Sequence, residues 1–346
     1  MSLADRTRNE DLRAAQKRAL IAVVVGALMV AAYVFSFVYA QASPTAHELP
    51  VGIVGPAGEV SQAEREIEQS TGDAFDVTRY GDEQRARNAI RDRDIYGALV
   101  LSPDGAKVLT APAAGESAAT QIETRLPRAV GLAGQGPPRV VEVRPLVADD
   151  PQGDALNLTI LPLIIFGIVM PVLLTNLAAM LPVRARLGAM ALFAVLSGLA
   201  AVLVAHAALD ALPGPFLALS ALAALLIFGV ASMTLAFMAR LGPAGAGVGF
   251  LLFLVIGNVA SGAAVVHEML PGAWRVVGPW LPPGAAATAI RNAAYFDGAK
   301  LLQPLILLIA FAIAGATLCL IGGGRRPAPQ GEPSGPTPDA TTATAA

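Results

Sequence analysis

The sequence predicts an α-helical polytopic membrane protein with six transmembrane helices and a small extracytoplasmic α/β domain between the first helix and the second. Six apolar segments are each long enough to cross a hydrocarbon core of roughly 30 Å as a helix of about 20 residues. These segments are 20–39, 156–180, 187–209, 216–239, 244–266 and 301–321. The stretch between the first two has a soluble composition. With 55% hydrophobic and 14% charged residues among 346, the chain is too apolar for an ordinary soluble enzyme.

These segments divide the chain into five parts. They are a cytoplasmic basic amphipathic arm (1–18), the first transmembrane helix (19–40), the extracytoplasmic α/β domain (41–155), a five-helix transmembrane bundle (156–322) with an outer amphipathic loop at 267–300, and a cytoplasmic tail (323–346). The tail is rich in Pro, Gly, Thr and Ala. It has too little apolar surface to bury, so we expect it to be disordered.

Basic residues near the ends of the apolar segments predict the orientation, because cytoplasmic loops carry an excess of Lys and Arg. On the predicted cytoplasmic side they are Arg6, Arg8, Arg13, Lys17, Arg18, Arg184, Arg186, Arg240, Arg325 and Arg326. The loop 210–215 has none, whereas the loop before the last span, with Arg275, Arg291 and Lys300, is an exception. We therefore expect a multi-pass protein of a bacterial plasma membrane, with both termini cytoplasmic and 41–155 outside.

A cleaved signal peptide is the competing interpretation of the first apolar segment. The sequence VYAQAS at 38–43 contains a small-residue site of the kind that signal peptidases cut, and basic residues precede the apolar run. The run of about 20 residues is longer than the 7–15 typical of a signal peptide. A retained signal anchor is therefore favoured.

Short periodic patterns replace the long apolar runs between 49 and 146, as expected for a small α/β domain. A Ser at 61 and a Glu at 64 predict the capped start of one helix, and Pro-Asp-Gly at 103–105 predicts a hairpin turn. The predicted elements are a strand at 49–55, a helix at 61–72, a strand at 74–80, a helix at 82–94, a hairpin at 95–111, a helix from 117 to Pro127, a loop at 132–138 and a strand at 139–146.

The domain carries no recognisable catalytic constellation, so no enzyme is predicted. The glycines of GIVGPAG lack the spacing and the Lys-Ser/Thr of a phosphate loop. The arginines of 85–93 alternate with carboxylates, which indicates a solvated helix face more than an anion site. The three histidines, His47, His206 and His267, have no local ligand spacing, and the single Cys319 lies in an apolar segment, so we expect neither a metal site nor a disulfide.

The membrane part contains few residues that interrupt the apolar pattern. No Asp, Glu, Lys or Arg lies at the centre of a span, which argues against an ion-coupled carrier. In the fifth span Gly245 and Gly249 form a small-xxx-small pair, and Gly257 and Ser261 repeat the spacing. These residues predict either close helix packing within the bundle or a homodimer interface.

The loop 267–300 is the most distinctive part of the membrane half. It contains both tryptophans, whose rings are expected at the headgroup level. It also contains several prolines, which prevent one continuous helix. We expect a short interfacial helix, a Pro-rich turn and an amphipathic helix at 285–296. The loop is interpreted as a membrane-resting connector or as an outer gate. The candidate gate residues are Trp274, Trp280, Pro282, Pro283, Arg291, Tyr295 and Phe296.

Five features give the chain a family resemblance. They are the basic arm with the first span, LPVGIVG at 49–55, IYGALVL at 95–101, the D-P-x-G element at 150–153 and GPWLPPGAAATAIRNAAYFDG at 278–298. On these the chain resembles the type-2 ABC exporter permeases (ABC-2 type), and more closely the phage-infection-protein, or YhgE/Pip-like, membrane proteins. The resemblance implies a homodimeric or heterodimeric permease half in the lipid bilayer. It also implies ATP bound to a separate cytoplasmic ABC ATPase, since the chain has no Walker motif and no cofactor site of its own.

One departure concerns the place where the ATPase docks. Such permeases typically carry an acidic-basic element in the loop after the second span, whereas LPVRARLG at 181–188 has no acidic residue. The arm at 4–18 is an alternative docking element. The candidate docking residues are therefore Arg184, Arg186, Arg13 and Arg18.

The resemblance and the span pattern together predict the function. We expect the membrane subunit of an exporter that moves an amphipathic or lipid-like substrate outward. The alternative is a non-transporting scaffold or receptor-like accessory protein of a secretion or cell-surface machine. Nucleic acid is not an expected partner.

Overall fold

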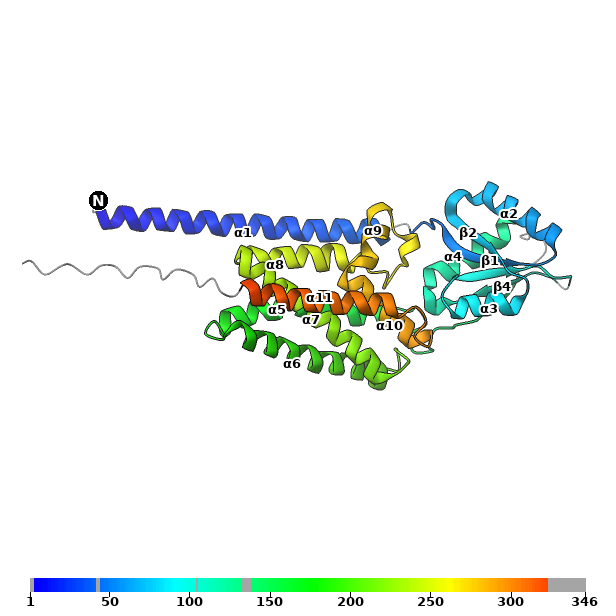
Figure 1. The fold of residues 1–346 in the computed structure, drawn as a ribbon. Helices are drawn as coiled ribbons and strands as arrows, with labels where there is room; N and C mark the ends of the chain where they lie inside the picture. Colours follow the sequence, from blue (N-terminus) through cyan, green and yellow to red (C-terminus); the bar gives the residue numbers. More distant parts are fainter. Residues whose placement is uncertain (1–2, 42–43, 104, 132–137, 323–346) are drawn as a thin grey trace, which may run out of the picture.

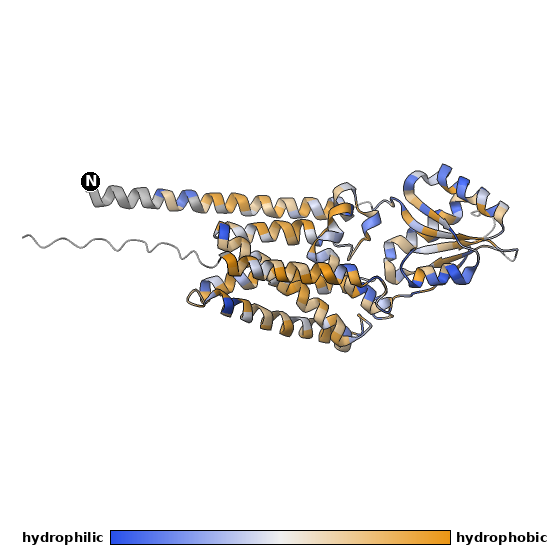
Figure 2. Ribbon diagram, in the orientation of Figure 1, coloured by the Kyte–Doolittle hydropathy of each residue, from blue (hydrophilic) through white to orange (hydrophobic). Residues whose placement is uncertain are grey.

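The computed structural model describes residues 3–41, 44–103, 105–131 and 138–322, and these are mostly helical. A long helix runs beside a bundle of helices, and a small α/β domain lies at one end of that bundle (Figure 1). Hydrophobic residues dominate the helical part and polar residues gather on the domain (Figure 2). The predicted disordered tail at 323–346 and most of the predicted loop at 132–138 lie outside the described residues.

Five helices in the described part of the chain are long and apolar enough to cross a membrane. The apolar segments lie at 13–40, 155–177, 183–208, 216–241 and 302–321. They belong to α1 (Leu3–Gln41), α5 (Ala155–Leu177), α6 (Val183–Val202) with its π-helical continuation η4 (Leu203–Ala208), α7 (Phe216–Leu241) and α11 (Leu302–Gly322). The predicted arm and first span form one continuous helix, α1.

The predicted span at 244–266 is shorter than expected. Its helix consists of α8 (Ala244–Gly249) and the π-helical η5 (Phe250–Asn258), and the chain then continues without helical structure to 266. The Ser261 hydroxyl donates to the Asn258 carbonyl at 2.7 Å and accepts from the Ala263 N–H at 3.2 Å, and Gly262 has φ +74°. These local bonds compete with the helical pattern and end the helix. The expectation of one full-length helix here is wrong.

The bundle is built around α7, which packs against α5, α6 and α11. Its core includes Leu219, Leu226 and Ile227, all fully buried. Small residues on the neighbouring helices permit a close approach. A Cβ at Gly198 of α6, for example, would lie 2.7 Å from the Ser220 carbonyl oxygen of α7. Tight packing of this kind is typical of helices that associate in a membrane.

The α/β domain contains a five-stranded sheet of order β2-β1-β3-β4-β5. Strand β1 (Leu49–Val54) runs parallel to β2 (Phe75–Arg79) and to β3 (Gly97–Val100). Strand β3 is antiparallel to β4 (Lys107–Thr110), which pairs in parallel with β5 (Arg139–Glu142). The predicted hairpin is therefore confirmed, and the last predicted strand is shorter than expected.

Helices cover both faces of this sheet (Figure 1). Helices α2 (Ala57–Thr71) and α4 (Glu116–Ala129) share one hydrophobic core, which includes Ile67 and Ile122. Helix α3 (Glu83–Arg91) packs on the opposite face through Ala86 and Ile90. In α3 the Asp82 carboxylate accepts from the Arg85 N–H at 2.8 Å, which is a regular N-cap.

The boundaries of all three helices in the domain differ from the prediction, and α3 ends at Arg91 instead of 94. Helix α2 begins at Ala57, directly after Pro56, so Ser61 and Glu64 lie inside the helix and do not cap it. The fixed φ of proline suits a helix start, and here it prevails over the capping-box pattern. Helix α4 continues through Pro127 to Ala129, whereas the prediction ended it at Pro127.

The segment that joins η5 to α11 enters the bundle. It forms a 3₁₀ turn η6 (His267–Met269), the short helix α9 (Gly272–Val277), a second 3₁₀ turn η7 (Gly278–Trp280) and helix α10 (Pro282–Tyr295). Helix α10 is buried along almost its whole length against α7, α11, α5 and η5. The predicted helix at 285–296 is therefore confirmed as α10, but it is buried in the bundle and does not rest on the membrane, because its alanines let it pack between larger neighbours.

Candidate functional site

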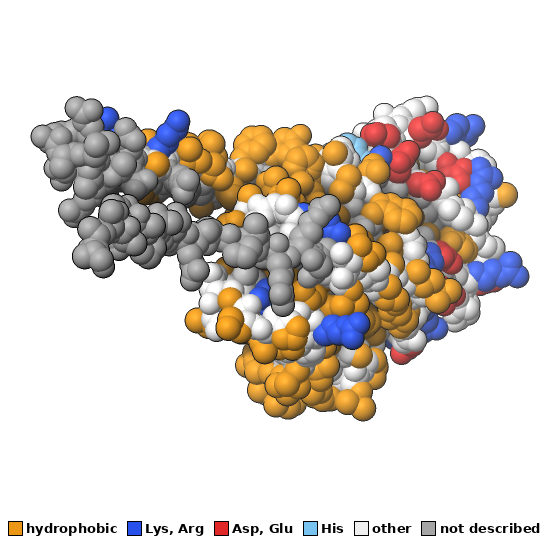
Figure 3. Space-filling view, turned by 60° about the vertical axis from the view of Figure 1, so that its left-hand side comes forward, with side chains coloured by type: hydrophobic (Ala, Val, Ile, Leu, Met, Phe, Trp, Pro, Cys, Tyr) orange, Lys and Arg blue, Asp and Glu red, His pale blue; other side chains and the backbone are white. Residues whose placement is uncertain are grey.

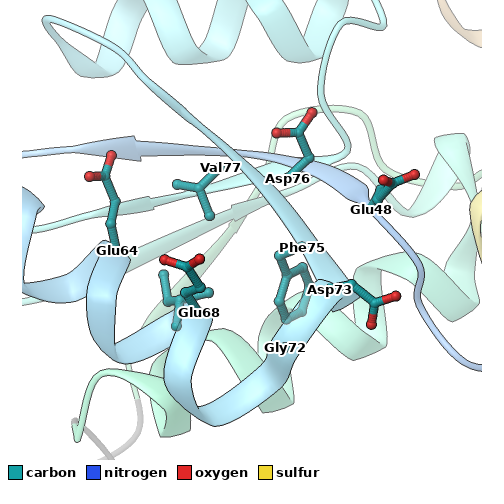
Figure 4. A pocket seen from close by; sticks show the side chains of 9 residues that line it. Glu48, Glu64, Glu68, Gly72, Asp73, Phe75, Asp76 and Val77 are labelled. Carbon is teal, nitrogen blue, oxygen red and sulfur yellow. The ribbon is translucent and has the colours of Figure 1, made fainter.

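An open cavity lies on the α/β domain (Figure 4). It has a volume of about 830 Å³ and five carboxylate side chains around it: Glu48, Glu64, Glu68, Asp73 and Asp76. Figure 4 shows these carboxylates pointing in different directions, so they do not converge on one point. Among the residues that the structure describes, no group of three or more His, Cys, Asp or Glu is arranged to hold a metal ion.

A second cavity lies between the α/β domain and the helical bundle, and we call it the junction cavity. Its volume is about 290 Å³. Its walls come from the domain, from the segment that joins η5 to α11 and from α11 itself. The lining residues are Pro50, Arg93, Asp94, Tyr96, Glu268, Pro279, Ala285, Thr288, Asn292, Lys300, Gln303, Pro304 and Leu307. It combines charged, polar and apolar side chains, and it adjoins the loop that the sequence analysis singled out.

Tyr96 and Glu268 form the central hydrogen bond of the junction cavity. Tyr96 precedes β3, and its hydroxyl donates to Glu268 Oε2 at 2.8 Å. Burial, with the nearby Glu268 carboxylate, raises the pKa of Tyr96 well above its usual value. The hydroxyl therefore remains a neutral donor at physiological pH.

Arg93 and Lys300 are the two cationic side chains that line the cavity. Arg93 follows the end of α3 with φ +60°, and its guanidinium donates to Asn292 Oδ1 at 2.6 Å. The same guanidinium lies 5.1 Å from the centre of the Phe296 ring. The Lys300 ammonium donates to the Arg93 carbonyl at 2.9 Å and forms an ion pair with Asp94 at 2.7 Å. Domain and bundle are thus held together by charged hydrogen bonds.

Arg291, next to Asn292 on α10, is buried behind the cavity. It donates to the carbonyl oxygens of Gly262 and Ala263 at 2.8 and 2.9 Å. These carbonyls belong to the irregular segment that follows η5, and buried carbonyls without a partner would be costly. Arg291 therefore anchors the end of the broken helix to α10.

Further polar contacts surround this junction. The Arg144 guanidinium is paired with Asp297, and Arg275 donates to the His47 carbonyl at 3.2 Å. The His47 N–H donates to the Glu268 carbonyl at 2.9 Å. These bonds join segments more than 150 residues apart and attach the domain to the segment that contains α9 and α10.

Most of the candidate gate residues contact the rest of the chain, whereas Trp280 is largely exposed. The Trp274 indole donates to Ser36 Oγ of α1 at 3.1 Å. Pro282 and Pro283 are buried at the start of α10, with Arg291 farther along it. Phe296 is fully buried between the guanidinium groups of Arg93 and Arg144, and Tyr295 is half-buried beside it. A gate role for these residues stays a prediction.

The small residues of the fifth predicted span all contact their own chain. A Cβ at Gly249 would lie 2.6 Å from Thr234 Oγ1 of α7, and one at Gly257 would lie 2.9 Å from Pro283 Cγ. Gly245 lies against the backbone of Phe237 and Met238, and Ser261 forms the local bonds described above. This arrangement favours packing within the bundle; the homodimer interface stays a prediction.

The candidate docking residues lie at the end of the bundle remote from the domain. Arg186 donates to the Ala179 carbonyl at 2.7 Å, and Arg184 is exposed beside it. Arg13 is exposed on α1, which extends beyond this end of the bundle (Figure 1). The side chain of Arg18 lies outside the described set.

The sequence analysis missed the charged half of the junction cavity. Arg93 was assigned to a solvated helix face, and Tyr96, Glu268, Asn292 and Lys300 were not singled out. One signal was available, since Arg93 stands between Asp92 and Asp94 where a helix gives way to a strand. The partners of Arg93 lie about 200 residues away, as the separation of 199 between Arg93 and Asn292 shows, and local patterns do not reveal such pairs.

Comparison with known proteins gives one family. Residues 17–178 match the family model described as ABC-2 family transporter protein. This region spans most of α1, the whole α/β domain and α5. Neither a curated protein nor a solved structure matches the chain. Over this region the chain is similar to the membrane proteins of ABC-2 type transporters, and together with the apolar helices the match supports a multi-pass membrane protein.

Proposed function

We propose that this chain is the membrane-spanning permease subunit of an ABC-type exporter. It moves an amphipathic or lipid-like substrate outward, with energy from ATP hydrolysed on a separate ATPase subunit. The family match over residues 17–178 is the observation that carries the proposal. Within this class the motifs at 49–55 and 278–298 favour a relation to the YhgE/Pip-like proteins.

The arrangement of the helices supports a six-span topology with the α/β domain outside the cell. The α/β domain and the polar segment 267–300 lie at one end of the bundle, and the connections that carry Arg184, Arg186 and Arg240 lie at the other (Figure 1). The surface between these ends is largely hydrophobic (Figure 3). The broken helix Ala244–Asn258, continued by the mostly buried segment 259–266, serves as the sixth crossing. Non-helical backbone is tolerated at such depth where protein surrounds it.

The same arrangement supports an ATPase partner at the arginine-rich end, which is cytoplasmic in this proposal. Arg184 is exposed, and α1 extends beyond the bundle there, so both proposed docking elements are accessible. The permease pairs with a second permease chain, identical or related, to enclose a translocation path. The non-transporting scaffold is favoured by one observation, the lack of an acidic residue in the loop 181–188.

Co-purification in mild detergent distinguishes these two functions. The tagged full-length protein, extracted from cells that produce it naturally, is expected to bring down a stoichiometric protein with Walker motifs. The double variant Arg184→Ala/Arg186→Ala is expected to lower its recovery about tenfold, since two charged contacts are removed. Arg125→Ala/Arg128→Ala on α4 is the matched control and should change nothing. Reproducible absence of an ATPase, with a secretion component in its place, supports the scaffold and overturns the permease.

A further inference from the structure

Glu268 is a charged group without an ionic partner at the junction cavity. Its side chain is half-buried, and the Tyr96 hydroxyl is its hydrogen-bond donor. Within the described residues it forms no ion pair. The nearby Arg291 directs its guanidinium to two backbone carbonyls instead. A carboxylate accepts about four hydrogen bonds and is seldom buried unpaired, so Glu268 has capacity left for a cationic group.

Two cationic side chains of the lining, Arg93 and Lys300, have donors left for an anionic group. Arg93 carries five N–H donors, of which one bond to Asn292 accounts for one. Lys300 carries three and uses two, on Asp94 and on the Arg93 carbonyl. Thr288 and Gln303 add neutral polar groups to the lining of the cavity. The four charged side chains of the cavity, two cationic and two anionic, sum to zero. A neutral ligand that carries both charges therefore complements them best.

The cavity also has an apolar side. Pro304 and Leu307 line it from α11, which is long and apolar enough to cross a membrane. The volume of about 290 Å³ is at the lower limit of small-molecule sites, which begin at about 300 Å³. It accommodates a headgroup, but not a complete lipid with two acyl chains. The remainder of an amphiphile would have to lie along α11.

We propose that the junction cavity binds the headgroup of a zwitterionic amphiphile. Its ammonium group lies at Glu268, its anionic group lies between Arg93 and Lys300, and its apolar tail follows α11 past Pro304 and Leu307. This proposal rests on the proposed function, because it names the class of substrate that the permease takes.

Native mass spectrometry of the purified full-length protein tests this. The protein in dodecyl maltoside is mixed with equal amounts of three probes that share one dodecyl chain: dodecylphosphocholine, dodecyl phosphate and dodecyltrimethylammonium. The unmodified protein should retain dodecylphosphocholine about tenfold better than either singly charged probe. Equal retention of the three probes overturns the proposal.

Two variants test which side chain binds which charged group of the amphiphile. Glu268→Gln keeps an acceptor for Tyr96 and removes the negative charge, so preference should shift to dodecyl phosphate. Lys300→Gln removes a positive charge from an exposed side chain and should shift preference to dodecyltrimethylammonium. A folding defect cannot shift the two variants in opposite directions. Glu123→Gln on α4 is the control and should behave like the unmodified protein. Preferences that both variants leave unchanged overturn the proposal.

The binding experiment and the co-purification experiment test the two proposals independently. The probes are measured on the isolated chain, without ATP and without a partner. If no ATPase co-purifies with the chain, the proposed permease function is overturned, and the binding result is unaffected. Absence of zwitterionic preference would overturn the junction site and leave the permease standing.

Discussion

His267 is a half-buried histidine at the junction of the domain and the bundle, beside Arg291. Its ring lies against Gly262 so closely that a Cβ there would be 2.5 Å from the imidazole Cε1, and its Nε2 has no hydrogen-bond partner within the described residues. Burial lowers the pKa of His267 to about 4, and the charges of Arg291 and Arg93 act in the same direction, against the opposing charge of Glu268. The neutral ring is therefore the form that the folded protein accommodates.

This shift predicts how stability depends on pH. The unfolded chain binds a proton at His267 near pH 6.5, whereas the folded protein does so only near pH 4, so the unfolded state binds more protons between these values. Stability should therefore fall as the pH drops from 6.5 to 4, by on the order of 3 kcal/mol in total. Thermal unfolding in detergent, followed by the fluorescence of Trp274 and Trp280, measures this directly.

A variant isolates the contribution of His267 from that of other groups. His267→Gln cannot take up a proton, so its melting temperature should decline less between pH 6.5 and pH 4.5 than that of the unmodified protein. His47→Gln, in the linker that precedes β1, is the matched control. An unchanged pH dependence in His267→Gln would show that protonation of this ring does not destabilise the fold.

Among the elements, the turn η7 and the start of α10 decide how the broken helix is accommodated. Gly278 lies directly against the Ala260 carbonyl, and Gly284 lies against the Gly278 carbonyl. A side chain at Gly278 has no space, so Gly278→Ala should separate the turn from the segment 259–266. Overpacking of this kind costs about 1–3 kcal/mol. We expect a melting temperature several degrees lower.

The contrast with a second glycine makes this expectation specific. Gly188 lies inside α6, and a Cβ added there would have no neighbouring side chain or backbone atom within 4 Å apart from its own helix turn. Gly188→Ala should therefore be neutral or stabilising, by up to about 1 kcal/mol. Equal melting temperatures for the two alanine variants would contradict the close packing of η7 against 259–266.

Local patterns predicted much of the domain and little of the junction. Alternation and turn residues located β1, β2 and the β3–β4 hairpin, because neighbouring residues decide these elements. The end of the helix at Asn258 was missed because the segment 244–266 is apolar throughout, and its composition alone predicts one continuous span. The burial of α10 was missed because alanine suits both a surface helix and a tightly packed one. The charged contacts of Arg93 and Lys300 depend on long-range pairing, which no local pattern contains.

At the scale of the whole molecule, the two ends of the bundle differ in chemistry. The α/β domain and the junction cavity lie at one end, and exposed Arg184 and the extension of α1 lie at the other. If the proposed substrate site lies at one end and the proposed ATPase site at the other, the bundle has to connect them. Helix α7 is placed to do this, since it packs against α5, α6, α10 and α11. The account therefore predicts transport that depends both on this chain and on ATP.

Transport into inside-out membrane vesicles tests this claim most directly. Vesicles are prepared from cells that produce the chain, from cells in which its gene is deleted and from the deletion strain carrying a restored copy. Each is given ATP and fluorescent amphiphiles with zwitterionic, anionic, cationic and uncharged headgroups. We predict that ATP drives at least one amphiphile into the lumen, that the deletion abolishes this uptake and that the restored copy returns it. Equal ATP-dependent uptake in all three preparations, for every headgroup, would contradict the account.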